Sequence, residues 1–441
     1  MKYVIFFAAA LGVPPMTFLL FINPRWMKYA FWGMTTAMCL YQATAINFFS
    51  HEFYAGSARG MEISLLHLIS IGLLAALVMH GKVKKLLPEF GFKLYFLYFL
   101  LCLPSLAVAD DLLISWLEIW KMIMLFMFYL TVYYYLKTTD DVNAVLKSLI
   151  LLLVVNFIST AKAHYAGVYQ PGGIFPHRNG MAMGMLLMGP MFFAGYLSYG
   201  LKRWFGRFCA IAVVCAVIST FWSYSRGALV MIPLAYGITT AASMLEGRKK
   251  FGGKFKRILP FVLVGIIGFM AILPKIIERF QEAPKESGET RKELAACAYE
   301  MIKANPITGV GINNWSLNMR PIHPYQDRAS DKLGVDLDYR GIVETVYLLV
   351  CAECGIPALV VMLAWFAWYW LSCILLLKRL RGTKWYFIPA GMLGALTANY
   401  MQSVLEWVLR QSLSLLCLVF TFSLLAYLNS NWRKLAKSKE E

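Results

Sequence analysis

The chain has 441 residues, of which 59% are hydrophobic and only 15% charged. Globular proteins carry roughly 25% charged residues, so this composition excludes an ordinary soluble protein. The net charge of +18 would favour nucleic-acid binding in a soluble protein. Here the Lys and Arg residues cluster in short loops between apolar runs, which is the positive-inside pattern of a membrane protein. We therefore expect a membrane protein with no nucleic-acid partner.

Apolar runs of membrane-spanning length recur along the whole chain. They predict an all-α polytopic bundle of about 12–13 transmembrane helices. The expected spans are 3–22, 28–48, 62–80, 92–109, 115–136, 142–161, 180–200, 208–224, 227–245, 258–275, 342–377, 385–406 and 410–428. When these spans alternate, all the clear basic loops fall on one side, which is the cytoplasmic side. Pro14-Pro15 interrupts the first span, so that segment is either a bent or a re-entrant piece.

The spans divide the chain into four consecutive regions. We expect N-terminal transmembrane helices over 1–150, a core over 151–377, C-terminal transmembrane helices over 378–428 and a cytoplasmic tail over 429–441. The core includes the single long extramembrane segment, 276–341, on the side opposite the cytoplasm. Loops of this length in compact proteins are usually functional. No cleavable signal peptide is evident, and the C-x-x-C of Cys351 and Cys354 lacks the second ligand pair of a metal site.

Two arginines begin helices on the expected non-cytoplasmic side, where positive charge is disfavoured. Arg226 stands in W-S-Y-S-R-G-A-L, between two spans, and Arg178 stands in P-H-R-N-G-M-A-M-G with His177 and Asn179. A guanidinium together with the free N–H groups of a helix start binds phosphate well. The alternatives are a snorkelling arginine at a helix end for Arg226 and an ordinary polar loop for the other motif.

The long segment predicts an amphipathic helix that begins near Thr290 and ends before Pro306. Leu294, Ala298, Met301 and Ile302 share one face, and Arg291 extends that stripe. Such a helix is expected to lie along the membrane interface. Arg291 then either borders the apolar face or points into a cavity at the membrane surface.

An acidic residue stands at the non-cytoplasmic start of the next span. Glu344 and Tyr347 lie one turn apart, which makes Glu344 a candidate general base and Tyr347 a residue that positions substrate. The alternative is an acid that complements the helix dipole. His323, in R-P-I-H-P-Y, is a further substrate-binding candidate, although a lone loop histidine often has no special role.

These motifs resemble, in order, the shared core of the O-antigen ligases, O-antigen polymerases and bacterial protein O-oligosaccharyltransferases. The resemblance covers roughly 150–370 and runs through P-H-R-N-G-M-A, S-R-G-A-L, N-P-I-T-G-V-G-I-N-N-W and E-T-V-Y-L-L-V-C-A-E-C-G-I-P. The arginines of the family map onto Arg226 and Arg291. The histidine of its H-N-x-Y-L pattern maps onto Glu344, which is a departure from the family.

The resemblance implies a GT-C-like fold in the bacterial inner membrane, with the active site on the periplasmic side. It implies an inverting transfer of a glycan from undecaprenyl pyrophosphate to an acceptor hydroxyl, with no cofactor or metal. Lipid A–core, a second lipid-linked repeat and a protein Ser or Thr remain open as acceptors; we favour lipid A–core. A transporter of an anionic lipid or solute is the alternative from another class, and a non-catalytic glycan-binding partner is a third possibility.

Overall fold

A computed structural model describes residues 2–51, 54–137, 139–281, 286–319, 323–333 and 341–437. Three stretches of the predicted long segment 276–341 lie outside the described residues: 282–285, 320–322 and 334–340. Residues 438–441 of the predicted tail also lie outside. Within the described part, α18 continues to Lys437, so the first nine residues of the predicted tail, 429–437, are helical.

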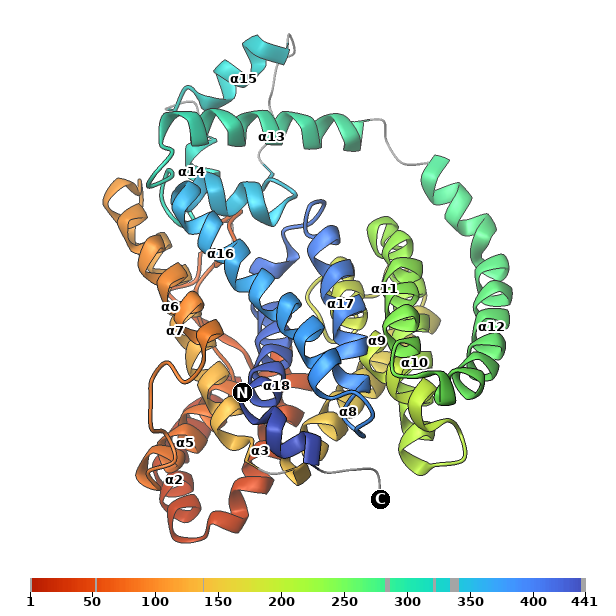
Figure 1. Ribbon diagram of the computed structural model, residues 1–441. Helices are drawn as coiled ribbons and strands as arrows, with labels where there is room; N and C mark the ends of the chain where they lie inside the picture. Colours follow the sequence, from red (N-terminus) through yellow and green to blue (C-terminus); the bar gives the residue numbers. More distant parts are fainter. Residues whose placement is uncertain are drawn as a thin grey trace. The chain divides into compact units, whose positions relative to one another are not determined.

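The described chain is mostly helical (Figure 1). Its contacts divide it into two compact units. The first unit comprises Met1–Ser148, Gly288–Trp368 and Ser403–Ala426. The second comprises Leu149–Ser287, Tyr369–Gln402 and Tyr427–Glu441. Each unit thus combines three separate stretches of chain. The four regions expected from the sequence are consecutive stretches, and that division stays a prediction.

The elements of the first unit are α1 (Lys2–Leu11), α2 (Val13–Ile22), η1 (Pro24–Trp26), α3 (Met27–Cys39), α4 (Tyr41–Thr44), β1 (Ile46–Phe48), β2 (Met61–Ile63), α5 (Leu65–Met79), α6 (Phe90–Cys102), η2 (Leu103–Val108), α7 (Leu112–Tyr135), α14 (Trp315–Asn318), α15 (Tyr325–Leu333) and η3 (Val408–Arg410). The second unit holds α9 (Arg178–Tyr199), α10 (Trp204–Trp222), α11 (Arg226–Met244), α12 (Arg248–Gln281) and α17 (Phe387–Gln402). Four helices contribute residues to both: α8 (Thr139–Tyr165), α13 (Glu286–Ala304), α16 (Val346–Arg379) and α18 (Ser412–Lys437).

The structure confirms an all-α, multi-pass helix bundle. Among the described residues, eight helices are long and apolar enough to cross a membrane, or nine if one bent pair counts as a span. The sequence predicts about 12–13, and the difference has identifiable causes. Helix α5 has 15 residues and α17 has 16, which is short of the roughly 20 that a bilayer requires. The expected span 258–275 lies inside α12, which is not among the eight helices.

The first two expected spans form the bent pair. The chain turns by 118° between Phe6–Ile22 and Pro24–Cys39. The helix does break beside Pro14-Pro15, as predicted, because α1 ends at Leu11 and α2 begins at Val13. The sharp bend is a second feature and follows Ile22. Pro14 lies in the first turn of α2, where its missing N–H has no acceptor within the helix and costs little.

The N-P-I-T-G-V-G segment docks on a break in α16. Gly355 interrupts the helix with φ +83° and ψ 171°, which frees carbonyl groups on the preceding turn. Val310 N donates to Ala352 O at 2.9 Å and Gly311 N donates to Glu353 O at 3.1 Å. Ile356 N donates to Pro306 O at 2.8 Å, on the other side of the break. The loop thereby satisfies backbone groups that the broken helix leaves open.

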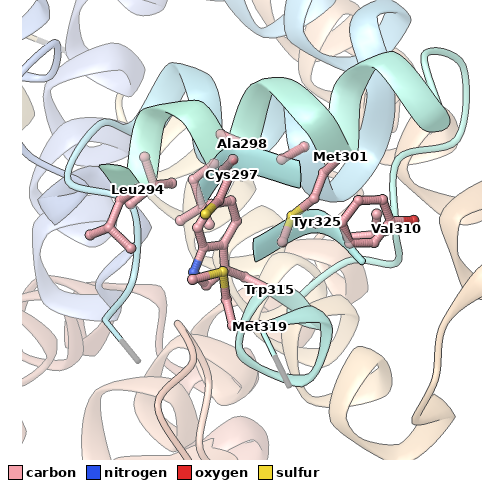
Figure 2. Packing of buried hydrophobic residues seen from close by; sticks show 12 residues of the cluster. Leu294, Cys297, Ala298, Met301, Val310, Trp315, Met319 and Tyr325 are labelled. Carbon is pink, nitrogen blue, oxygen red and sulfur yellow. The ribbon is translucent and has the colours of Figure 1, made fainter. Parts of the chain in front are cut away.

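A hydrophobic cluster lies under α13 and joins it to α14, α15 and the start of α16 (Figures 1 and 2). The fully buried Trp315 ring is directly below α13, beside Cys297 and Met319 (Figure 2). From the side of α16, Val343, Leu349 and Ala352 complete the cluster. The apolar face of α13 is therefore covered by the protein's own core. The predicted interfacial helix is wrong in this respect, because Leu294, Ala298 and Met301 are at most 2% exposed and unavailable to lipid.

The second unit is organised around α9, which is buried along its length. A Cβ added at Gly189 of α9 would lie 2.6 Å from Tyr236 Oη of α11 and 3.0 Å from Ala216 Cβ of α10. Gly189 is eleven residues from the start of α9 and Tyr236 is ten from the start of α11. These two helices are connected through α10, so they run in the same direction and begin at the same end of the unit.

The docking loop makes a prediction about Gly309, which has φ +68° and whose added Cβ would lie 2.3 Å from the Glu353 carbonyl carbon. Gly81 is a matched control in the same unit, with φ +62° and open space around its Cβ position. Gly81→Ala should cost about 1–2 kcal/mol for the left-handed backbone alone. Gly309→Ala should destabilise more, because the loop must also separate from α16. Thermal unfolding in detergent measures both, and equal losses would contradict the tight docking.

Candidate functional site

Two of the predicted site residues meet in the first unit. Arg291 Nε of α13 pairs with Glu344 Oε2, two residues before α16 begins. The side chains are 36% and 40% exposed, so the pair lies at the surface and a ligand can reach it. Arg291 lies in the second turn of α13 rather than at its head, because the helix begins at Glu286 and not near Thr290. The structure thus brings together an arginine and a carboxylate that are 53 residues apart.

The hydrophobic cluster under α13 fixes both partners of this ion pair. Leu294, one turn after Arg291, is buried in the cluster. Val343, the residue directly before Glu344, is buried in the same cluster. Trp315 Nε1 donates to Gly341 O at 2.9 Å, which holds the approach to Glu344. Val346 N donates to Ser403 O at 3.2 Å, which holds the residue that begins α16. A rigid shell of this kind keeps reacting groups in place.

Among the described residues, the pairing with Glu344 engages only the Nε donor of Arg291. A guanidinium has five N–H donors in a planar fork, and Glu344 occupies the one on Nε. A phosphate bound by the remaining donors would compete with Glu344 for the same positive charge. The pair is therefore a place where an incoming anion can release a carboxylate.

The other two candidates of this unit have separate surroundings. Tyr347 lies in the first turn of α16, one turn after Glu344. His323 Nε2 is 2.8 Å from Asp110 Oδ2, and its ring stacks at 5.8 Å on Tyr325. In the described part of the chain, no hydrogen bond or ion pair joins His323 to Arg291 or Glu344.

The remaining candidates lie at one end of the second unit. Arg178 is the first residue of α9 and Arg226 the first residue of α11, as the sequence predicts. His177 is the N-cap of α9, and its Nδ1 accepts from Asn179 N at 3.3 Å. The loop before α9 and the turn before α11 touch, because the rings of Tyr169 and Tyr224 stack at 5.5 Å. Both helix starts, each with its partial positive charge, therefore belong to one end of this unit.

A buried amide beside α11 escaped the sequence interpretation. Gln402, at the end of α17, is 0% exposed, and neither of its amide atoms has a hydrogen-bond partner in the described chain. A Cβ at Gly227 would lie 3.6 Å from Gln402 Nε2, so the amide lies against the residue that follows Arg226. Ser225, the N-cap of α11, makes no capping hydrogen bond with its side chain. The start of α11 therefore has buried polar groups that can bind a ligand or a water molecule.

A buried group of four charges in the first unit was also missed. Glu118 Oε2 is 2.6 Å from Lys121 Nζ, and Glu118 Oε1 is 3.2 Å from Arg410 Nε. Arg410 Nη2 is 3.0 Å from Glu353 Oε2, and all four residues are at most 8% exposed. The i, i+3 spacing of Glu118 and Lys121 inside an apolar run was the available signal. Arg410 lies at the start of the expected span 410–428, and no sequence pattern there indicates its two carboxylate partners.

Metal and thiol chemistry have no assembled site in the described chain. No group of three or more His, Cys, Asp and Glu residues there could hold a metal ion. All nine cysteines are free and buried. Burial and the nearby carboxylate of Glu293 raise the pKa of the Cys297 thiol to about 11, which leaves it protonated and unreactive at neutral pH.

Residues 211–363 match a family model described as O-antigen ligase. The match confirms the resemblance to the O-antigen ligase and polymerase superfamily. It contains Arg226, Arg291 and Glu344, and it ends eight residues after the Gly355 break in α16. A search of curated proteins found no match. The O-antigen ligase match supports a glycosyltransferase-like enzyme of ligase or polymerase type, which uses glycan and lipid substrates in a membrane.

The buried charges predict the outcome of Glu353→Gln. This change removes one of the two carboxylates that face Arg410 and should cost about 1–3 kcal/mol, because Glu118 remains as the partner of the buried guanidinium. The control is Asp110→Asn, which breaks the His323 pair, whose side chains are 27% and 36% exposed. That change should cost less than about 1 kcal/mol. Thermal unfolding of both proteins in detergent provides the comparison, and equal stability would contradict the anchoring role of Glu353.

Proposed function

We propose that the protein transfers a glycan from undecaprenyl pyrophosphate to an acceptor hydroxyl, with lipid A–core as the acceptor. We place the reaction at the periplasmic side of the bacterial inner membrane. The observation that carries this proposal is the ion pair of Arg291 with Glu344, because it joins an anion-binding group to a base at the surface of the matched segment.

The arginines bind phosphate in this proposal. Arg291, beside Glu344 in the first unit, binds the pyrophosphate and stabilises its charge as the anomeric bond breaks. Arg226 and Arg178, at one end of the second unit, are proposed separately as phosphate-binding residues. His177 and Asn179 line the same helix start as Arg178 and contact the donor's phosphate or first sugar. Helix starts favour negative charge, which supports the placement of phosphate at α9 and α11.

Glu344 acts as the general base. When pyrophosphate takes over Arg291, the carboxylate is released and can accept the proton of the acceptor hydroxyl. The acceptor oxygen attacks the anomeric carbon from the face opposite the pyrophosphate, and the configuration inverts. The bond from the anomeric carbon to the phosphate oxygen breaks, and undecaprenyl pyrophosphate leaves with the electron pair. Tyr347 and His323 position the acceptor, and no metal takes part in these steps.

Arginine variants test the donor site. Arg226→Ala and Arg291→Ala should each lower glycan transfer by about a hundredfold or more, because each removes a proposed phosphate-binding residue. Lys292→Ala, one residue along α13 and exposed, is the control and should keep full activity. The variants are introduced into a deletion strain, membrane insertion is checked by immunoblot, and lipopolysaccharide is resolved on a gel. A normal ladder from both arginine variants would refute the site.

The gel of the deletion strain also separates the acceptors. Loss of the whole ladder together with accumulation of lipid-linked polymer supports the ligase proposed here. A band with a single repeat would instead identify a polymerase, in which a second lipid-linked repeat is the acceptor. An unchanged gel would contradict both and favour another glycan acceptor or transport.

Variants of Glu344 test the base. Glu344→Gln keeps the shape but cannot accept the proton, so transfer should fall by about 10²–10⁴-fold. Glu344→His places at this position the residue expected from the family pattern and should retain part of the activity. Initial rates with purified protein and a lipid-linked donor give the comparison. Full activity in Glu344→Gln would show that the base lies elsewhere.

A further inference from the structure

A polar groove lies between α13 and α15, away from the ion pair of Arg291 and Glu344. It has a volume of about 480 Å³, which is within the range of about 300–1,000 Å³ typical of small-molecule sites. Residues of α13 form one wall and residues of α15 the other. Its lining consists of Glu300, Lys303, Ala304, Arg328, Asp331 and Lys332.

The two walls are fixed by the same core. Met301 and Ala298 of α13 and Ala329 of α15 are fully buried in the cluster around Trp315. Asn305 Nδ2 donates to the Tyr325 hydroxyl at 3.1 Å, which ties the end of α13 to the start of α15. The groove is therefore formed before any ligand arrives, so binding does not require the walls to be ordered first.

The groove contains a charged group that is almost completely buried. The Glu300 side chain is 5% exposed and pairs with Lys332, whose side chain is 52% exposed. Lys332 also lies over the exposed ring of Tyr299, with Nζ 5.5 Å from the ring centroid. A buried carboxylate, a half-exposed ammonium and an aromatic face thus lie together at this side of the groove.

This chemistry narrows the class of ligand. Five of the six lining residues are charged, which excludes lipid chains and apolar molecules. The three cationic side chains repel a metal ion. They exceed the two carboxylates by only one positive charge, which is too little to bind the phosphate backbone of a nucleic acid. Carboxylates accept hydrogen bonds from sugar hydroxyls, whereas Arg and Lys donate to phosphate. A phosphorylated oligosaccharide satisfies both kinds of group.

The position of the groove also favours a ligand of several sugars. Residues 300–304 follow Arg291 by nine to thirteen positions on the same helix. At about 1.5 Å and 100° per residue, this places the groove roughly 14–20 Å along α13 from the ion pair and on another side of the helix. Only an acceptor of several sugars can reach from the groove around α13 to Glu344.

We infer that the groove between α13 and α15 binds the phosphorylated oligosaccharide part of the glycan acceptor. This inference rests on the proposed function for the identity of the acceptor, but the binding event can be measured without transfer.

The test uses the full-length protein in detergent and two probes. These are the core oligosaccharide released from lipopolysaccharide by mild acid, and the same material after its phosphates are removed. Calorimetric titration should show that the phosphorylated probe binds more tightly. Arg328→Ala and Asp331→Asn should each weaken its binding by about tenfold, because each removes a charge-assisted hydrogen bond. Asp327→Asn, on the exposed face of α15 outside the groove, should bind as the wild type does.

Several outcomes would overturn the inference: no binding by the wild type, equal binding of the dephosphorylated probe, or unchanged binding in both lining variants. Equal weakening in Asp327→Asn would mean that the helix, not the groove, was affected. Arg291→Ala separates the two proposals, because it should lose transfer and keep oligosaccharide binding. If Arg291→Ala and Arg226→Ala keep transfer, the proposed function fails while the titration still decides the groove.

Discussion

The packing of the 306–315 loop against α16 in the first unit depends on a buried carboxylate, Glu353. It pairs with Arg410, accepts a hydrogen bond from Trp315 N at 3.4 Å and gives its own carbonyl to Gly311 N. Two segments that are distant in sequence, 311–315 and the one that contains Arg410, therefore converge on one residue of α16. A buried carboxylate is costly unless it is paired and hydrogen-bonded, so these contacts form together or not at all. This mutual requirement favours one arrangement of the loop, α16 and the segment before α18.

That arrangement determines where the candidate reacting groups lie. With Trp315 fixed by Glu353, the cluster beneath α13 has a defined shape, and Arg291 and Glu344 are held at its edge. In the absence of donor, the two charges neutralise each other. In the proposed reaction, an arriving pyrophosphate exchanges partners with Glu344, so that donor binding and release of the base are coupled.

In the second unit, two helix starts that carry arginine form an electropositive end. Two helices, α9 and α11, begin at one end with arginine as their first residue, so side-chain charge and helix dipole act in the same direction. The buried amide of Gln402 adds polar groups beside α11. Such an end suits a phosphate group, whereas the groove between α13 and α15 offers both carboxylates and cations, which suit the phosphorylated oligosaccharide proposed above.

The sequence by itself determined the membrane-embedded all-α class, because apolar runs and the distribution of Lys and Arg are local properties of the chain. It also placed the helix starts at Arg178, between His177 and Asn179, and at Arg226, between Ser225 and Gly227. The pairing of Arg291 with Glu344, the covering of α13 and the partners of Arg410 were decided only by the tertiary structure. Each depends on contacts between residues tens to hundreds of positions apart, and periodicity cannot report such contacts. An amphipathic helix has the same pattern whether lipid or a Trp315 core covers its apolar face, and only the packing distinguishes the two.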